Sequence, residues 1–428
     1  MNLIKYKFSD FFYKDNFYLF IYLLIPTSII FSKFLAEVLI FTLLIYVLFN
    51  IFKKKLINSN YFNYKNDFFN VFYSILFFFI IIFINKIINY SNFVDLIKPL
   101  GLLRFSIIFL LPFILIKINK IKFNKNIFFF IIAPTVILNL DLIFQFYYGY
   151  NIIGYPFDND YKRASSFFGK EKIAGYYLYF NFFLILFSLK FFRQKMIIYI
   201  LIGFTYFAIY LTGDRMPFLL VNFSILILSI LFLKNIINFL RINFNKKFLY
   251  IFLFIAIIST IINSNVKKII ITEKYSNSVS QVKNFNFEET RYYYHFNKAI
   301  LIFKNNFIFG TGYKTFRVEC SNEKYNNDNF LRFNGCATHP HNYYLEIMSE
   351  NGIVGLIAFV YIIYILIKYL TRKINNNDDG NNKIMLAFIL SFFFPFKTTG
   401  SFYTNFNLIM FFFLLSFYFF LNSLKKIE

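Results

Sequence analysis

The sequence predicts an all-α polytopic membrane protein with about twelve transmembrane helices and one large loop on the outer face. Of its 428 residues, 58% are hydrophobic and only 15% are charged, which is too apolar for an ordinary soluble protein. The apolar residues occur in runs long enough to cross a bilayer, and the charged residues lie between the runs. These two observations exclude a soluble globular class.

Twelve apolar runs mark the predicted spans, and the first two form a tight hairpin at Ser32-Lys33. The spans divide the chain into a first domain of nine helices (1–263), a long outer loop (264–343) and a last domain of three helices (344–428). The runs cover roughly residues 17–31, 34–52, 67–85, 100–116, 127–147, 174–189, 196–211, 216–233, 248–263, 344–367, 384–396 and 404–422.

We interpret the net charge of +24 as a consequence of the membrane topology, because the basic residues are unevenly distributed between the two sides. Just over half of the 45 Lys and Arg residues fall in the alternate segments that include both termini. Because cytoplasmic segments are enriched in Lys and Arg, both termini are predicted to be cytoplasmic. The basic residues form no single face, so we predict no nucleic-acid binding, and the remaining charge would favour anionic membrane lipids.

The long outer loop contains both cysteines and all three histidines. An outward loop of an inner membrane faces an oxidising compartment, so a disulfide between Cys320 and Cys336 is expected, with two free thiols as the alternative. Within this loop, residues 288–304 show helical spacing of apolar side chains. A turn is predicted at Gly310-Thr-Gly312. The spacing over 288–304 predicts an amphipathic helix that is compatible with lying along the membrane surface. The residues of its apolar stripe are Tyr292, Phe296, Ala299, Ile300 and Phe303.

His339 and His341 lie just ahead of a predicted membrane helix, in the stretch Thr338–Leu356. Ionisable groups at such positions are usually functional, and histidine changes charge near neutral pH. We therefore predict that these two histidines perform acid–base chemistry.

Five of the nine arginines fall in outer loops. A guanidinium group binds two phosphate oxygens at once and keeps its charge, so Arg163, Arg215 and Arg291 together are predicted to bind a diphosphate. For each one alone, an interfacial anchor or a simple ion pair is the alternative. Arg317 and Arg332 are the other two.

Several carboxylates and amides have less specific signals. Asp141 and Gln145 lie four apart within the fifth span, where they are expected to line an acceptor site or to hydrogen-bond another helix. Glu346 is a further candidate for the acceptor site. Asp158-Asn-Asp160 matches a weak metal-binding pattern, but the same residues are typical of turns, and no metal is predicted.

The chain shows no nucleotide-binding loop, thiol redox pair or Cys/His zinc pattern, so no cofactor is predicted. A membrane transporter is the alternative from another functional class. It is disfavoured because the polar residues gather outside rather than at the middle of the membrane.

An ordered set of segments resembles the O-antigen ligase and polymerase family of bacterial inner-membrane proteins. The set begins with Arg163–Leu178 and Thr212-Gly-Asp-Arg215. It continues with Arg291, Ala299 and the Gly310–Phe316 turn, and it ends with His341–Glu346 and Gly352–Gly355. The resemblance covers roughly residues 130–370, whereas the first four spans match only in hydropathy.

Two departures from the family pattern stand out. The family often has Ser before the Arg of its second motif, whereas this chain has Asp214, whose carboxylate is expected to pair with Arg215. The usual Trp of the third segment is absent, and His295 or Phe296 stands in its place.

The resemblance implies a glycosyltransferase of lipopolysaccharide biosynthesis that works at the periplasmic face of the inner membrane. It would move a glycan from undecaprenyl diphosphate to a lipid A core sugar with inversion and without a metal. His341 would act as the base and His339 would support it. A polymerase that uses a second carrier-linked repeat as the acceptor is the alternative. The ligase is favoured because the outer polar mass lies in one long loop.

Overall fold

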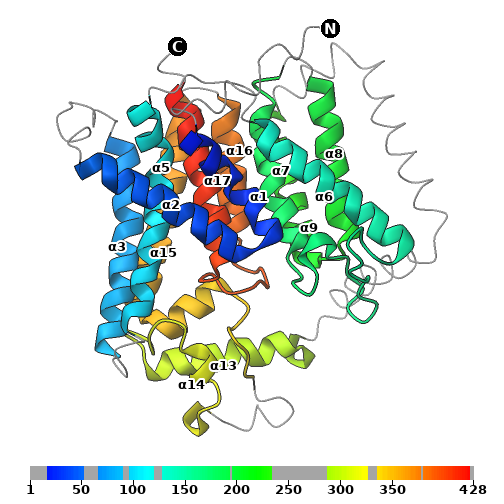
Figure 1. Ribbon diagram of the computed structural model, residues 1–428. Helices are drawn as coiled ribbons and strands as arrows, with labels where there is room; N and C mark the ends of the chain where they lie inside the picture. Colours follow the sequence, from blue (N-terminus) through cyan, green and yellow to red (C-terminus); the bar gives the residue numbers. More distant parts are fainter. Residues whose placement is uncertain are drawn as a thin grey trace, which may run out of the picture. The chain divides into compact units, whose positions relative to one another are not determined.

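The computed structural model describes residues 17–52, 66–89, 96–119, 128–192, 195–233, 287–325, 335–376 and 379–424 (Figure 1). Over these ranges the regular structure is helical, and the only extended pairings are two isolated bridges, Tyr150–Pro156 and Asp158–Arg163. The predicted all-α class is therefore confirmed for this part of the chain. The predicted ninth span, 248–263, lies outside the described residues, so the total of about twelve spans stays a prediction.

Each predicted span that falls within the described residues coincides with a helix. Five of these helices are long and apolar enough to cross a membrane: α2 (Lys33–Phe52), α3 (Asn66–Ile88), α6 (Phe129–Tyr148), α15 (Tyr343–Asn376) and α17 (Asn405–Leu424). Six shorter helices match the remaining runs: α1 (Phe17–Phe31), α5 (Leu103–Asn119), α7 (Ala174–Ser188), α8 (Lys195–Leu211), α9 (Arg215–Leu231) and α16 (Gly380–Phe392).

The predicted end of the eleventh span at residue 396 is wrong, because α16 already ends at Phe392. Pro395 follows closely, and the residue before a proline avoids helical backbone angles. Residues 393–404 therefore form a loop between α16 and α17.

The chain forms two compact units. Unit 1 combines three sections, Met1–Ile131, Asn286–Asn376 and Phe393–Glu428. Unit 2 combines Ile132–Phe285 with Asn377–Phe392.

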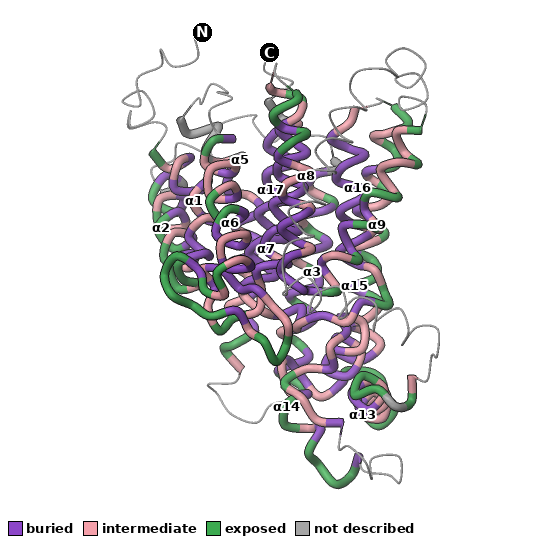
Figure 2. The backbone as a smooth tube through the Cα atoms, turned by 90° about the vertical axis from the view of Figure 1, so that its right-hand side faces the viewer, coloured by how far each residue is buried: buried purple, intermediate pink, exposed green. Residues whose placement is uncertain are grey.

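In unit 1, α17 packs against α5 and α1, while α3 packs against α15. Figure 2 shows that α17 is buried along nearly its whole length. Polar groups join these helices: the Tyr22 hydroxyl donates to Ser416 Oγ (2.9 Å), which donates to the Ile108 carbonyl (3.1 Å). Since membrane helices gain little from hydrophobic burial against one another, close packing and such bonds stabilise the unit.

In unit 2, α7 packs against α8 and α9, and α16 packs against α9 and α7. α7 is buried at almost every position. The Tyr179 hydroxyl hydrogen-bonds Ser391 Oγ (2.7 Å), and Asn139 Nδ2 donates to Thr205 Oγ1 (3.0 Å). These bonds satisfy polar side chains that would otherwise be costly within a membrane helix bundle.

A break at Gly352 divides α15 into a short first segment and a long second one. Gly352 has φ 65° and ψ −164°, which are not helical angles. The loop after Asn306 pairs with the break, because Gly312 N donates to Glu350 O (2.7 Å) and Ile353 N to Phe307 O (2.8 Å). A Cβ at Gly352 would lie 2.2 Å from the Ile308 carbonyl oxygen, so only glycine fits.

Candidate functional site

All three histidines of the chain meet in unit 1. The ring centroid of His341 lies 4.3 Å from that of His339 and 5.2 Å from that of His295. Tyr292 completes the group with an edge-on contact to His341 at 5.7 Å. Sequence reasoning selected His339 and His341 but not His295. The available signal was that His295 is the only other histidine and that it occupies a predicted helix of the same loop.

His295 is carried by α13 (Arg291–Asn305), which confirms the predicted amphipathic helix. Thr290 caps its first turn, because its hydroxyl accepts from Tyr293 N (3.3 Å). α13 packs against α15. The helix thus presents His295 from a rigid element.

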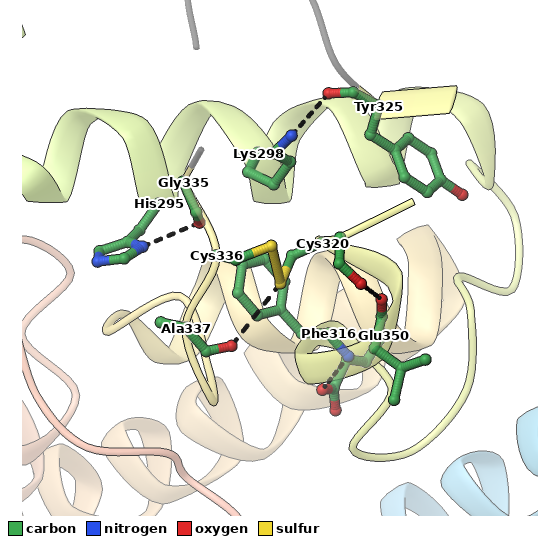
Figure 3. The surroundings of a disulfide bond; sticks show 11 residues. His295, Lys298, Phe316, Cys320, Tyr325, Gly335, Cys336, Ala337 and Glu350 are labelled. Carbon is green, nitrogen blue, oxygen red and sulfur yellow. Dashed lines mark hydrogen bonds between the residues drawn. A yellow bond between two sulfur atoms is a disulfide. The ribbon is translucent and has the colours of Figure 1, made fainter. Parts of the chain in front are cut away.

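The apolar stripe of α13 is only partly buried in the structure. Ala299 is fully buried, whereas Tyr292 is exposed and Phe296, Ile300 and Phe303 are half-buried. One face of the helix packs toward a cluster formed by Ala299, Ile302, Phe316, Cys320 and Tyr325. Lys298 is accommodated on this face because its ammonium donates to the Tyr325 carbonyl (2.9 Å; Figure 3). The residues of α13 that are buried are Tyr294, His295, Lys298, Ala299 and Ile302.

A disulfide joins Cys320 to Cys336, with their Cα atoms 5.1 Å apart. Figure 3 shows that the residue before Cys336 contacts the histidine cluster: His295 Nδ1 donates to the Gly335 carbonyl (2.9 Å). A carbonyl only accepts, so Nδ1 carries the proton and Nε2 is the basic nitrogen of the neutral His295 ring. The disulfide therefore helps to fix the orientation of His295.

His341 adopts a left-handed backbone conformation, with φ 60°. The Thr399 amide donates to the His341 carbonyl (2.8 Å) and holds this conformation. Asn342 adds a second attachment, because its Nδ2 donates to the Pro395 carbonyl (2.6 Å) while its Oδ1 accepts from Tyr344 N (3.0 Å) at the start of α15. Sparsely populated backbone angles held in this way are typical of functional sites.

The surroundings keep the histidines of the cluster neutral. Burial, followed by the neighbouring His341, lowers the pKa of His339 from 6.5 to about 4. Burial and the neighbouring His295 also lower the pKa of His341, although the Thr399 backbone opposes the shift. At neutral pH both rings are therefore able to accept a proton.

Two buried carboxylates on the first segment of α15 bind loop backbones. Glu346 Oε2 accepts from Phe402 N (2.7 Å). Glu350 accepts from Lys314 N (2.7 Å) and Phe316 N (3.1 Å). Glu350 was not selected from the sequence. The acceptor-site role of Glu346 stays a prediction, and its observed bond holds the 393–404 loop beside the histidines.

Lys397 lies on the same 393–404 loop and was also missed. Its side chain is buried, and Nζ lies 3.9 Å from the centroid of the Tyr343 ring. Burial lowers the pKa of Lys397 well below its ordinary value. The only sequence signal was a lysine in the Phe-rich segment between the last two spans.

In unit 2, two segments that the sequence singled out are adjacent. Arg163 Nε forms an ion pair with Asp214 Oδ1 (3.1 Å), and Ala164 N donates to the Thr212 carbonyl (3.1 Å). The expected pairing of Asp214 with Arg215 is corrected, because the buried Asp214 carboxylate points to Arg163 and accepts from Gly175 N at the start of α7 (3.3 Å). Arg215 is exposed at the first position of α9.

Asp141 and Gln145, both fully buried in α6, bind the loop that follows their own helix. Asp141 Oδ1 accepts from Ile152 N (2.9 Å), and its other oxygen accepts from the Ser166 hydroxyl. Gln145 Oε1 accepts from Ser166 N (2.7 Å). Their observed contacts shape a loop, and the acceptor-site role stays a prediction.

Asp158 belongs to a turn. Its Oδ1 accepts from Tyr161 N (2.9 Å) and its Oδ2 pairs with Lys172 Nζ (2.6 Å). Within the described ranges, no group of three or more His, Cys, Asp or Glu side chains is arranged to hold a metal ion.

Arg291 is exposed at the first position of α13, one helical turn before His295. Arg291 belongs to unit 1 with the histidines, whereas Arg163 and Arg215 belong to unit 2. Arg317 is exposed on the short helix α14 (Phe316–Glu319) of unit 1, and Arg332 lies outside the described residues.

A model of the O-antigen ligase family matches residues 197–360. The matched range begins in α8 and ends in α15. It includes Arg215, Arg291 and both His339 and His341, but it does not reach Arg163. No curated protein matches the chain.

Proposed function

We propose that this chain, in which residues 197–360 match a model of the O-antigen ligase family, transfers a glycan from undecaprenyl diphosphate to a sugar hydroxyl of lipid A core. The reaction would take place at the periplasmic face of the bacterial inner membrane. The observation that carries the proposal is the cluster of neutral histidines around His341, held just ahead of a membrane helix.

In the proposed reaction His341 is the general base. It takes the proton of the acceptor hydroxyl while that oxygen attacks the anomeric carbon of the donor sugar. The bond from this carbon to the diphosphate oxygen breaks, and the diphosphate leaves with the electron pair. Attack on the opposite face inverts the anomeric centre. The lowered pKa of His341 supports this role because the ring is unprotonated at neutral pH.

The neighbouring rings are proposed to position His341 rather than to react. His339 contacts it directly, and His295 is oriented by the Gly335 carbonyl. Burial keeps the pKa of both neighbours low, so they add no positive charge that would make His341 harder to protonate during the reaction.

Arg163, Arg215 and Arg291 are proposed to bind the donor diphosphate. Guanidinium groups stabilise the negative charge that develops on the leaving diphosphate, so no metal ion is required. The positions of Arg215 and Arg291 support this role. Each begins a helix of at least 15 residues, where the unpaired backbone amides and the helix dipole also attract anions.

The test is an envelope glycan gel from cells with the intact gene, a deletion, or the His341→Ala variant. We expect the variant to lose long glycan on lipid A core, as the deletion does, with transfer slowed roughly 10²–10⁴-fold. Arg291→Ala should give the same pattern. Tyr361→Ala, at an exposed position of α15, is the matched control and should behave like the intact protein.

The outcomes separate the alternatives. Cores capped with a single repeat unit would identify a polymerase that uses a second carrier-linked repeat as the acceptor. An unchanged glycan pattern in the His341→Ala variant, with normal amounts of protein in the membrane fraction, would contradict the proposed base and favour a transporter.

A further inference from the structure

The turn that follows α6 in unit 2, from Tyr148 to Phe157, carries several exposed apolar side chains. Ile152 and Ile153 are 67% and 65% exposed, and Tyr148, Tyr150 and Tyr155 are exposed beside them. The segment contains no Asp, Glu, Lys or Arg, whereas charged residues begin immediately afterwards at Asp158. The turn thus has an uncharged, apolar tip.

The backbone amides of this tip do not depend on water for their hydrogen bonds. Every backbone N–H from Asn151 to Phe157 is hydrogen-bonded within the chain, and Pro156 has none to satisfy. Water can hydrogen-bond the amides of an exposed loop. A loop in a medium poor in water must instead satisfy its amides within the chain. The bonds run from Asn151 to Tyr155 O, Ile152 to Asp141 Oδ1, Ile153 to Asn151 Oδ1, Gly154 to Asn151 O, Tyr155 to Asn151 Oδ1 and Phe157 to Gly149 O.

The tip is also held rigidly on its membrane helix. The Asp141 carboxylate binds Ile152 N, and Gln145 Nε2 donates to the Tyr155 carbonyl (3.1 Å). Phe144 in the last turns of α6 contacts Tyr148, with the two tilted rings 4.4 Å apart between centroids. The apolar side chains are therefore preorganised and lose little conformational freedom on meeting a partner.

We propose that this tip inserts into the interfacial layer of the bilayer, with Ile152 and Ile153 reaching the boundary of the acyl chains. α6 is long and apolar enough to span a membrane, so a turn that starts at its last residue begins at the membrane surface. Tyrosine rings are enriched at that level because one end is apolar and the other is polar.

A glycan is a less suitable partner for this surface. Sugars stack on aromatic faces, but the two most exposed side chains of the tip are the aliphatic Ile152 and Ile153. Aliphatic side chains without neighbouring charges favour acyl chains, since burying them removes apolar surface from water.

The absence of tryptophan from the chain allows a direct test. The Ile153→Trp variant, in bilayers that contain lipids brominated along the acyl chains, carries one fluorophore at the tip. We expect a blue-shifted emission and strong quenching by the brominated lipids. Tyr161→Trp is the matched control, because Tyr161 is similarly exposed but lies in the charged half of the same loop. Its quenching by brominated lipid should be several-fold weaker.

Equal quenching of the two variants by brominated lipid, or stronger quenching of Ile153→Trp by aqueous iodide, would overturn the proposal. A shift of the Ile153→Trp emission on adding a soluble glycan would overturn the proposal and indicate that the tip binds a sugar instead of lipid. Ile152→Trp serves as a second probe if Ile153→Trp does not reach the membrane, and it is held to the same criteria.

Discussion

At the scale of single residues, His341 depends on atoms from two other segments of unit 1, the 393–404 loop and α13. The Thr399 amide holds its carbonyl, Asn342 attaches the next residue to the 393–404 loop, and His295 approaches its ring from α13. Each contact restrains the ring of His341 or its backbone. A general base needs such fixation, because proton transfer requires the acceptor nitrogen within hydrogen-bonding reach of the hydroxyl.

Acidification is expected to inactivate the protein at a lower pH than an ordinary histidine would dictate. Burial and His295 lower the pKa of His341 below 6.5, so the ring stays neutral and able to accept a proton at pH 6.5 and loses this ability only at lower pH. The measurement is kcat/KM of the reconstituted protein from neutral to acidic pH.

The His295→Phe variant tests whether His295 contributes to the lowered pKa of His341. It keeps an aromatic ring against His341 but removes a group that can become charged, so the pKa of His341 should rise and the acid limb should move to higher pH. An unchanged profile would show that His295 does not influence the base.

At the scale of elements, the break in α15 organises the surroundings of the site. Its first segment carries Glu346 and Glu350, which hold two different loops, while its second segment is the membrane helix. The loop around Gly310 packs directly against the break, since a Cβ at Gly310 would lie 2.4 Å from the Glu350 carbonyl carbon. The break therefore provides the close contact that holds the loop around Gly310.

The Gly352→Ala variant should lower the melting temperature of the purified protein and reduce transfer. The added methyl group would clash with the Ile308 carbonyl. The angles φ 65° and ψ −164° also fall in a region that is essentially restricted to glycine, which costs another residue roughly 1–3 kcal/mol before the clash is counted. Gly400→Ala is the matched control, because a Cβ there has no heavy atom within 4 Å. Equal melting temperatures for the two variants would contradict the importance of the break.

Helices were predictable from the sequence, but their faces and ends were less so. Apolar runs marked α2, α3 and α17 because length and hydropathy decide whether a segment can span a bilayer. Apolar spacing predicted the helix α13, but it does not reveal which side meets the disulfide-linked cluster. The end of α16 was predicted too late because hydropathy continues past Phe392 up to Pro395.

Site residues were predictable only where a local pattern marked them. His339 and His341 share one short motif, whereas His295 and Lys397 are brought close to that motif by tertiary contacts between segments far apart in the sequence. Glu350 likewise binds a distant loop, at Lys314 and Phe316. Tertiary structure likewise decides the partner of Asp214. Its carboxylate pairs with Arg163, which lies in another loop, and not with the adjacent Arg215.

At the scale of the whole molecule, each unit is assembled from sections that are distant in the chain. Unit 1 combines three sections and contains the histidines, and unit 2 combines two and contains Arg163 and Arg215. The division into spans 1–263, an outer loop 264–343 and spans 344–428 stays a prediction, as does the cytoplasmic position of both termini.

Thiol labelling tests that topology. In spheroplasts, a membrane-impermeant maleimide should label Cys320 and Cys336 only after reduction, because the disulfide blocks both thiols and the loop is predicted to face outward. A Glu428→Cys variant that lacks the two native cysteines should be labelled only in inside-out vesicles. Labelling of Glu428→Cys in intact spheroplasts would overturn the predicted orientation.

The central position of α17 has a consequence for biogenesis. This helix is synthesised long after α1, yet the Tyr22 hydroxyl of α1 finds its partner there, at Ser416. Until residues 405–424 are inserted, α1 and α5 lack the helix α17 against which they pack, and the Tyr22 hydroxyl lacks its Ser416 partner. Unit 1 is therefore completed only once α17 is in place, and nonsense mutations that remove α17 should yield chains that membrane quality control degrades.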